Sequence, residues 1–179
     1  ETPVVWSCHS AAFSMTLPWS IEELDPHDAT SAVAALFAPA AFDTLYASTD
    51  GGAPYPVLAA SLPTRDGAGC ILKLRPGLRT AAGAPIFAHD VVTSFNRAAS
   101  RGAAPLLAPF AEPRSIPDEP FAIAFRKAEP VALARALASP LAAIVPRGFD
   151  PRAPDGTGAF GAKIRGGVLE LARNERAAR

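Results

Sequence analysis

The stretch "GAPIFAHDVVTSF", residues 83–95, joins two kinds of local structure that do not mix. Its first half holds Gly83 and Pro85, which disfavour a helix because glycine costs backbone entropy and proline lacks an N–H donor. From residue 89 onward, apolar residues recur about once per helical turn, so the pattern predicts a loop that turns a corner into a helix over residues 89–99. The apolar stripe of that helix consists of Val91, Val92, Phe95, Ala98 and Ala99.

The adjacent His89 and Asp90 are the first pair that an enzymatic interpretation could use. Neighbouring residues on a helix point about 100° apart, so we expect no base and orienting acid in contact with each other. Asp90 falls in the first helical turn, where free N–H groups and the helix dipole stabilise a carboxylate. The pair is therefore interpreted as a capping acid beside a surface histidine, and the join as a structural corner.

No other motif supplies catalytic or metal-binding chemistry. His9 and His27 have no His or Cys at ligand spacing, and the sequence contains neither a G-x-S-x-G elbow nor a Walker A motif. "DGTGAF" (155–160) lacks the G-x-G-x-x-G pattern of a dinucleotide-binding turn. The acid pairs Glu22–Glu23 and Asp118–Glu119 lie in polar loops, where solvated charge is the simpler interpretation. We expect no catalysis, no cofactor and no metal.

Composition indicates a globular chain with no preference for polyanions. The 179 residues are 49% hydrophobic and 19% charged, enough for one good-sized domain or two small lobes. Seventeen basic residues balance seventeen acidic ones, which gives no support for binding nucleic acid or anionic membranes. No apolar run approaches the length of a membrane span. Cys8 and Cys70 are too few for a metal site; a long disulfide loop or two free thiols remain open at this point.

Local patterns predict a mixed α/β fold without a strict βαβ rhythm. Expected strands lie at 4–8, 70–75, 121–127, 141–146 and 168–174, with a hairpin tip at 65–69. Besides 89–99, helices are expected at 30–45 and 130–138. Thr30 or Ser31 can cap the first of these helices, and Pro39 should bend or break it. Its expected apolar face consists of Val33, Leu36, Phe37, Ala40 and Ala41.

Taken in order, short pieces of the chain resemble the family 5 extracellular solute-binding proteins, the receptors of oligopeptide, dipeptide and nickel ABC importers. Each piece is weak alone, but nine in the family's order and near its spacing cover residues 24–174. They are "LDPH" (24–27), "FDTLY" (42–46), "PVLAASL" (56–62), "ILKLRPGLR" (71–79), "GAPIFAHDVVTSFNR" (83–97), "FAIAFRKAEP" (121–130), "LASPLAAIVP" (137–146), "GTGAF" (156–160) and "LELARN" (169–174).

The chain also departs from the family pattern. Ala82 stands where the family usually has Asp, Phe87–Ala88 where it has Thr-Ala before the helix acid, and Ala159 where Pro commonly follows the glycines. We expect Gly156 and Gly158 to let the backbone turn sharply where the family's chain passes back between lobes. Family members run to several hundred residues, so the resemblance implies an N-terminal lobe fragment, a truncated lobe of type II periplasmic-binding-protein fold with a mixed sheet and flanking helices.

The resemblance implies how that lobe is divided. Residues 1–44 and 155–179 would belong to the ligand-facing subdomain, and residues 45–154 to a subdomain inserted into it. Cys8 and Cys70 then fall in different subdomains, which favours free thiols. Family ligand contacts carried over to this chain suggest a ligand-binding set of Phe13, Ser14, Thr30, Ser31 and Ala32.

The implied function is substrate binding for an ABC-type uptake system that carries peptides or related small solutes. The implied partners are the solute and ABC permease subunits, and the truncated lobe is expected to self-associate through its uncovered surface. The implied location is periplasmic or extracellular, with a membrane anchor on a removed N-terminal segment left open. The alternative is a stand-alone, non-transport interaction or sensory module derived from the same lobe.

Overall fold

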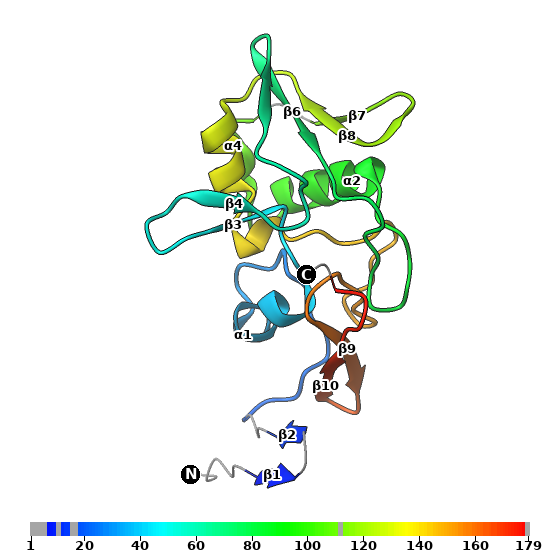
Figure 1. Ribbon diagram of the computed structural model, residues 1–179. Coiled ribbons are helices and arrows are strands. Elements are labelled where there is room, and N and C mark those ends of the chain that lie inside the picture. The colour runs from blue at the N-terminus through cyan, green and yellow to red at the C-terminus, as the bar shows by residue number, and fades with distance from the viewer. Residues whose placement is uncertain (1–6, 10–11, 15–17, 111–112, 178–179) are drawn as a thin grey trace.

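The computed structural model describes residues 7–9, 12–14, 18–110 and 113–177, and for the first two of these ranges only the backbone (Figure 1). It is a mixed α/β fold, as predicted. The strands are β1 (Ser7–His9), β2 (Ala12–Ser14), β3 (Tyr46–Ser48), β4 (Pro54–Pro56), β5 (Thr64–Asp66), β6 (Gly69–Lys73), β7 (Arg114–Ile116), β8 (Glu119–Phe125), β9 (Phe160–Arg165) and β10 (Val168–Arg173). The helices are α1 (Ala32–Ala41), α2 (Ala88–Ala99), α3 (Ala104–Leu107), α4 (Pro130–Ala136) and the 3-10 helix η1 (Pro140–Ala142).

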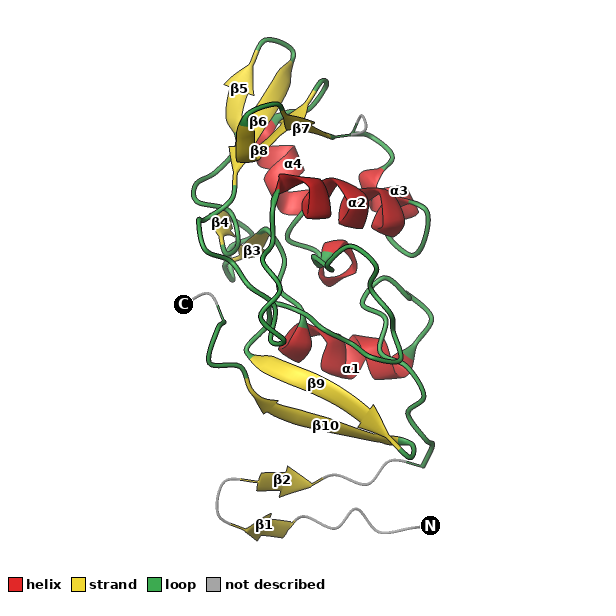
Figure 2. Cartoon of the chain, turned by 90° about the vertical axis from the view of Figure 1, so that its right-hand side faces the viewer, coloured by secondary structure: helices red, strands yellow, loops and turns green. Residues whose placement is uncertain are grey.

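An antiparallel four-stranded sheet of order β5-β6-β8-β7 forms the upper body of the molecule (Figure 2). The expected hairpin tip at 65–69 is confirmed, since β5 pairs with β6 around Gly67, whose φ of 55° suits glycine. In the β6–β8 register Leu72 lies opposite Ile123 and Cys70 opposite Phe125. These paired side chains share one face, and all four are buried.

Helix α2 covers the sheet and confirms the corner predicted at residues 83–99. Phe95 is buried and meets Phe125 edge to face, with ring centroids 5.5 Å apart. Val91 and Ala98 are buried beside it, while Val92, expected to be buried, is only half-buried at the edge of the same core. The main hydrophobic cluster therefore lies between α2 and the β6–β8 face, and it extends to α4 through Leu133.

The expected strand at 141–146 is wrong. Residues 140–142 form η1, and the chain then runs extended without pairing in a sheet. Its polar groups are satisfied singly: the Ile144 N–H donates to the Asp43 carbonyl at 2.9 Å, and the Val145 N–H donates to Ser94 Oγ at 3.1 Å. An apolar run of this length indicates burial, which holds here, but it does not establish strand pairing.

The lower body consists of α1 packed against the β9–β10 hairpin (Figure 2). The hairpin turns at Gly166–Gly167, both with positive φ, as a two-residue turn between right-twisted strands requires. Ala162 faces α1 and is buried, and Ile164 and Leu169 pack partly against the same small cluster. This second cluster also includes Leu24, Phe42 and Val145.

Helix α1 does not break at Pro39 but runs on to Ala41. The predicted apolar face is only partly correct. Ala41 is buried, and Val33 and Phe37 pack partly against the small cluster, but Leu36 is 59% exposed, and Ala34 and Ala38, which were not predicted, are buried. Alanine on the inner face lets the helix lie close to the hairpin, so the larger residues turn outward or to the flank.

The chain bends at residues 157–159, as expected around Gly158. Neither Gly156 nor Gly158 has a positive φ, so the need for glycine comes from the backbone of α1, which lies against both. A Cβ on Gly158 would lie 2.5 Å from the Ala41 carbonyl carbon, and one on Gly156 would lie 2.2 Å from the Ala41 oxygen. These glycines are needed for the close approach of two chain segments between the upper and lower bodies.

Candidate ligand-facing site

The residues suggested as ligand contacts lie at the start of α1 and in β2. Thr30 and Ala32 are exposed, and Ser31 is half-buried. Ser31 is the N-cap of α1, and its Oγ accepts the Ala34 N–H at 3.1 Å. Phe13 and Ser14 belong to β2, whose side chains lie outside the described part of the chain. Their role as ligand contacts stays a prediction.

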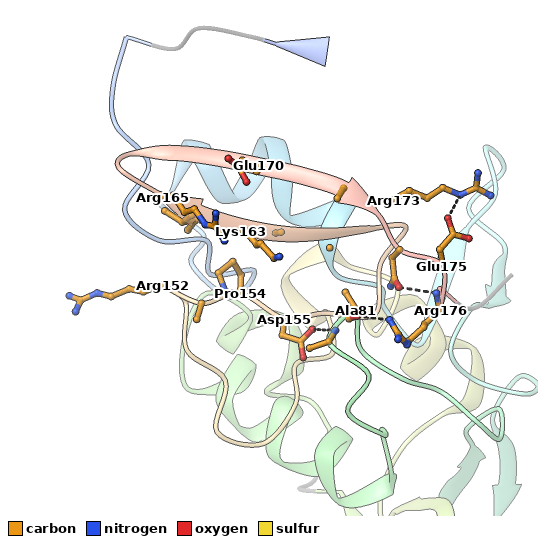
Figure 3. A pocket seen from close by; sticks show the side chains of 17 residues that line it. Ala81, Arg152, Pro154, Asp155, Lys163, Arg165, Glu170, Arg173, Glu175 and Arg176 are labelled. Carbon is orange, nitrogen blue, oxygen red and sulfur yellow. Dashed lines mark hydrogen bonds and ion pairs between the residues drawn. The ribbon is translucent and has the colours of Figure 1, made fainter. Parts of the chain in front are cut away.

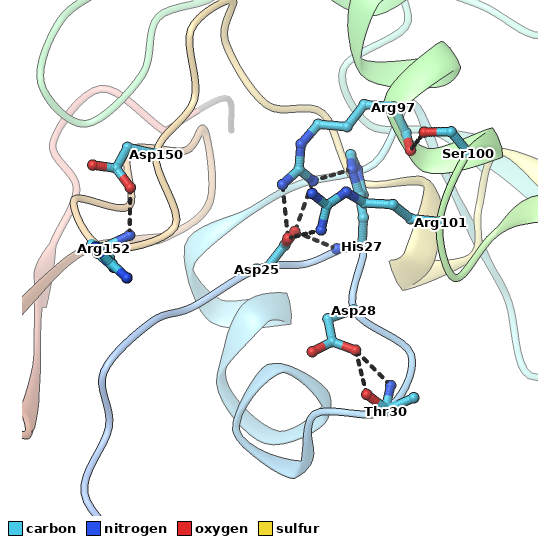
Figure 4. Close-up of polar contacts among 9 residues, drawn as sticks. All are labelled: Asp25, His27, Asp28, Thr30, Arg97, Ser100, Arg101, Asp150 and Arg152. Atoms are coloured by element: carbon cyan, nitrogen blue, oxygen red, sulfur yellow. Dashed lines mark hydrogen bonds and ion pairs between the residues drawn. The ribbon is translucent and has the colours of Figure 1, made fainter.

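Asp28 shapes the loop that presents these residues (Figure 4). Its Oδ1 accepts the Thr30 N–H at 2.8 Å and the Thr30 hydroxyl at 2.7 Å. The two hydrogen bonds from Thr30 are the main reason that the pKa of Asp28 lies below its ordinary value. Thr30 and Ser31 therefore both use their hydroxyls inside the loop.

Immediately before this loop, a buried carboxylate meets two arginines of the upper body (Figure 4). Asp25 is only 4% exposed and receives a two-pronged contact from Arg97, NH1 to Oδ1 at 2.8 Å and NH2 to Oδ2 at 2.7 Å. Arg101 NH1 adds a 3.1 Å bond to Oδ2, and the His27 N–H donates to Oδ1 at 3.0 Å. Burial is the largest single influence and would raise the pKa of Asp25, but the hydrogen bonds from Arg97 and the His27 N–H, together with the Arg97 charge, outweigh it and hold that pKa below its ordinary value.

His27 completes this cluster, and its surroundings determine its tautomer. Nε2 lies 2.8 Å from the Ala143 carbonyl oxygen, which can only accept, so Nε2 carries the proton. Nδ1 lies 2.7 Å from Arg97 NH1, which can only donate, so Nδ1 is the acceptor. Burial, reinforced by the nearby Arg97 charge, lowers the pKa of His27. The ring is neutral and both nitrogens are engaged, which leaves none for proton transfer.

The sequence pointed to this cluster only indirectly. "LDPH" (24–27) is one of the pieces that carry the resemblance, and Arg97 is the last residue of another, with no role assigned to it. Asp25 and Arg97 are 72 residues apart, so their contact depends on tertiary structure. The available signal was a histidine and an aspartate flanking a proline beside a buried leucine.

His89 and Asp90 of the corner helix contact each other, contrary to the expectation from their sequence. His89 Nε2 lies 3.4 Å from Asp90 Oδ2. The imidazole is long enough to swing back beside the carboxylate, which the angle between Cβ directions did not take into account. The capping role of Asp90 is confirmed, since its Oδ2 accepts the Phe87 N–H at 2.9 Å. Asp90 is buried, and His89 is exposed as expected.

Asp43 is a further polar group at the junction of the two bodies. It follows the end of α1, and its N–H lies 3.4 Å from Thr157 Oγ1 on the returning segment. Burial raises the pKa of its carboxyl to about 6. Among the described residues no cation forms an ion pair with it, so no attraction offsets its desolvation.

A cleft of about 700 Å³ lies between the β9–β10 hairpin and the loops at residues 81–82 and 152–155 (Figure 3). Its lining is mostly apolar, with charged side chains around it. Asp155 and Arg176 there bind the backbone of Ala82 and Ala81. Thr30, Ser31 and Ala32 do not line it. The charged residues around it are Arg152, Asp155, Lys163, Arg165, Glu170, Arg173, Glu175 and Arg176.

Within the described residues, no helix has the length and apolar character to cross a bilayer. Over the same part of the chain, no group of three or more His, Cys, Asp or Glu side chains is placed to hold a metal ion. Cys70 is a buried free thiol that donates to the Ala128 carbonyl at 3.2 Å. Cys8 lies outside the described side chains.

No protein-family model and no curated protein matches the sequence. Solved structures do match. Clavulanic acid biosynthesis oligopeptide binding protein 2 is 26% identical with a TM-score of 0.69, and the match covers 90% of this chain and 35% of that one. The nickel ABC transporter from Bacillus halodurans is 25% identical with a TM-score of 0.71, over 88% and 34%. NikA from Brucella suis, solved with Fe(III)-EDTA, is 19% identical with a TM-score of 0.74, over 90% and 35%.

These matches extend over nearly all of this chain and about a third of each solved protein. The sheet, the corner helix and the returning hairpin are therefore elements of a larger architecture that those proteins share. The chain has the α/β fold of a first-lobe portion of the family 5 extracellular solute-binding proteins, the family that its sequence resembles.

Proposed function

We propose that this chain is part of the substrate-binding component of an ABC-type uptake system for peptides or related small solutes. The observation that carries the proposal is the match over 88–90% of the chain to proteins named for oligopeptide binding and nickel transport. The enzymatic alternative has little support, because His27 has both ring nitrogens engaged and Asp90 caps a helix. The proposed receptor needs no cofactor and performs no catalysis.

The proposal includes two subdomains, residues 1–44 with 155–179, and residues 45–154 inserted between them. Two hydrophobic clusters support this division in outline. The larger joins α2, α4 and the four-stranded sheet, while the smaller joins α1 to the β9–β10 hairpin and also takes in Ala143 and Val145 from the end of the inserted segment. The chain crosses between them near Asp43 and again near Gly156.

The ligand would meet the start of α1 through Thr30, Ser31 and Ala32, together with Phe13 and Ser14 of β2. Exposure of Thr30 and Ala32 supports this placement. Since Thr30 and Ser31 use their hydroxyls within the loop, they offer a ligand mainly backbone groups and shape. The charged ends of a peptide would then find their partners elsewhere, on surfaces that enclose the ligand from the other side.

The proposed setting is outside the cytoplasm, where the receptor would deliver solute to ABC permease subunits. We further propose that this chain by itself self-associates through the β9–β10 hairpin. Phe160, Val168 and Leu171 are exposed there, and a two-stranded sheet leaves free edges that attract partners. Light scattering at rising protein concentration tests this, and a strictly monomeric chain would contradict it.

The function is tested on the product of the whole reading frame that contains this chain. Isothermal calorimetry against a mixed pool of di- to pentapeptides should show saturable binding with a stoichiometry of about one. A reading frame that continues into a second lobe, beside genes for permease subunits, supports the receptor. A frame that continues into a membrane span or a kinase, with no peptide binding, would establish the interaction or sensory module instead.

A further inference from the structure

The segment that precedes the ligand-facing loop is attached to the upper body at several points. The Leu24 N–H donates to the Pro151 carbonyl at 2.8 Å, and the Gly102 N–H donates to the His27 carbonyl at 3.0 Å. Leu24, Asp25 and His27 are all buried. The loop at 28–32 begins one residue after the last of these attachments, so its position depends on theirs.

The polar contacts of this segment fix its orientation. Arg97 engages both oxygens of Asp25, and a two-pronged arginine–carboxylate contact fixes orientation as well as distance. The same guanidinium reaches His27 Nδ1 at 2.7 Å and lies over the Phe149 ring, 5.1 Å from its centroid. Buried ion pairs add little net stability compared with apolar packing. The main consequence of this contact is therefore the orientation that it imposes on the segment.

We infer that Asp25, His27 and Arg97 form a positioning cluster that fixes the ligand-facing loop, residues 28–32, on the inserted subdomain. Arg97 acts through Asp25 and His27 and does not itself touch the ligand. Arg101 is half-exposed and makes one bond to Asp25, so it contributes less to orientation. The functional meaning of the loop rests on the proposed function, whereas its dependence on Arg97 does not.

Hydrogen exchange measured by mass spectrometry on this chain tests the inference. In Arg97→Gln, the amides of residues 24–32 should exchange about tenfold faster, while those of β6 and β8 keep their rates. Arg97→Lys should behave like Arg97→Gln, because lysine keeps the charge but cannot contact both carboxylate oxygens. Arg101→Gln is the matched control and should change exchange at 24–32 by less than about threefold.

Unchanged exchange at 24–32 in Arg97→Gln would overturn the inference, and so would an equal rise throughout β6 and β8, which would show a general loss of stability. If the Arg97 variants do not fold, a measurement on the unaltered protein tests the inference. Nitrogen-15 NMR of the His27 ring at neutral pH should show a proton on Nε2 and an unprotonated Nδ1. The opposite tautomer, or a ring in free exchange with solvent, would contradict the cluster. Neither measurement uses a ligand, so failure to bind peptides would count against the proposed function alone.

Discussion

The upper and lower bodies of this protein are held together in different ways. Among the described residues, the cluster under the four-stranded sheet contains 24 buried hydrophobic residues, including Phe95, Phe125 and Leu133. The cluster between α1 and the β9–β10 hairpin contains eight, five of which are alanine. Around it Leu36 is 59% exposed and Val168 58%. The upper body therefore has a core of its own, while the lower body depends on its contacts with the upper one.

The contacts between the bodies are close, and they are both polar and apolar. They include the Asp25–His27–Arg97 cluster, the Asp43 crossing, the two glycines beside α1 and the edge-to-face contact of Phe42 with Phe149. In this junction, called the seam below, a few residues set the position of the lower body against the upper one. The stability of a large apolar core is instead shared among many residues. The two bodies should therefore respond differently to substitution.

The largest effect is expected in the upper core. Phe95→Ala removes a buried ring that meets Phe125, so it should lower the free energy of unfolding by about 3–5 kcal/mol. Phe160→Ala, in the exposed hairpin, is the matched control and should cost less than about 1 kcal/mol. Urea unfolding measures both. A cost below about 1 kcal/mol for Phe95→Ala would show that the comparison of the two cores is wrong.

The close packing at the seam is tested by adding a single methyl group at Gly158. Gly158→Ala would place its Cβ 2.5 Å from the Ala41 backbone, so α1 or the returning segment must shift, at a cost of about 1–3 kcal/mol. Gly51→Ala, whose nearest neighbour would be a side-chain oxygen 3.9 Å away, should be nearly neutral. Thermal unfolding followed by circular dichroism compares the two. Equal melting temperatures would mean that the seam is loosely packed.

A smaller effect, of opposite sign, is expected at Asp43. Its pKa of about 6 lies above the ordinary value of 3.8, so its favourable contribution is present below pH 3.8 and is lost as pH rises through 6. Asp43→Asn should therefore stabilise the protein at pH 7, by about 1–2 kcal/mol once solvent screening is allowed for. Urea unfolding from pH 4 to 7 measures the difference. A variant that is less stable than the parent at pH 7 would show that the carboxylate has a partner.

Sequence patterns predicted the upper body better than the lower one, for a physical reason. In α2 the large residues point inward, so the spacing of Val91, Phe95 and Ala98 marked the buried face correctly. In α1 the fully buried residues are alanines, so the predicted stripe included the exposed Leu36 and missed Ala34 and Ala38. Hydrophobic periodicity locates a core made of large side chains but not one made by close backbone approach.

The same limit applied to the candidate site. Ser31 was recognised as a possible helix cap because that signal is local. The Arg97–Asp25 contact and the Gly158–Ala41 packing join segments far apart in sequence, and no local pattern encodes them. The expected break at Pro39 did not occur, and α1 continues for two residues beyond it.

The central claim, that residues 28–32 are the ligand-facing part of an open lobe, is tested most directly by titrating nitrogen-15-labelled chain with the di- to pentapeptide pool. A surface that contacts the ligand from one side pays most of the entropic cost of association and gains only part of the contacts. We predict fast-exchange shifts centred on residues 28–32, with a dissociation constant in the millimolar range, on the order of −4 kcal/mol. Micromolar affinity, or shifts confined to the four-stranded sheet and α2, would contradict the account.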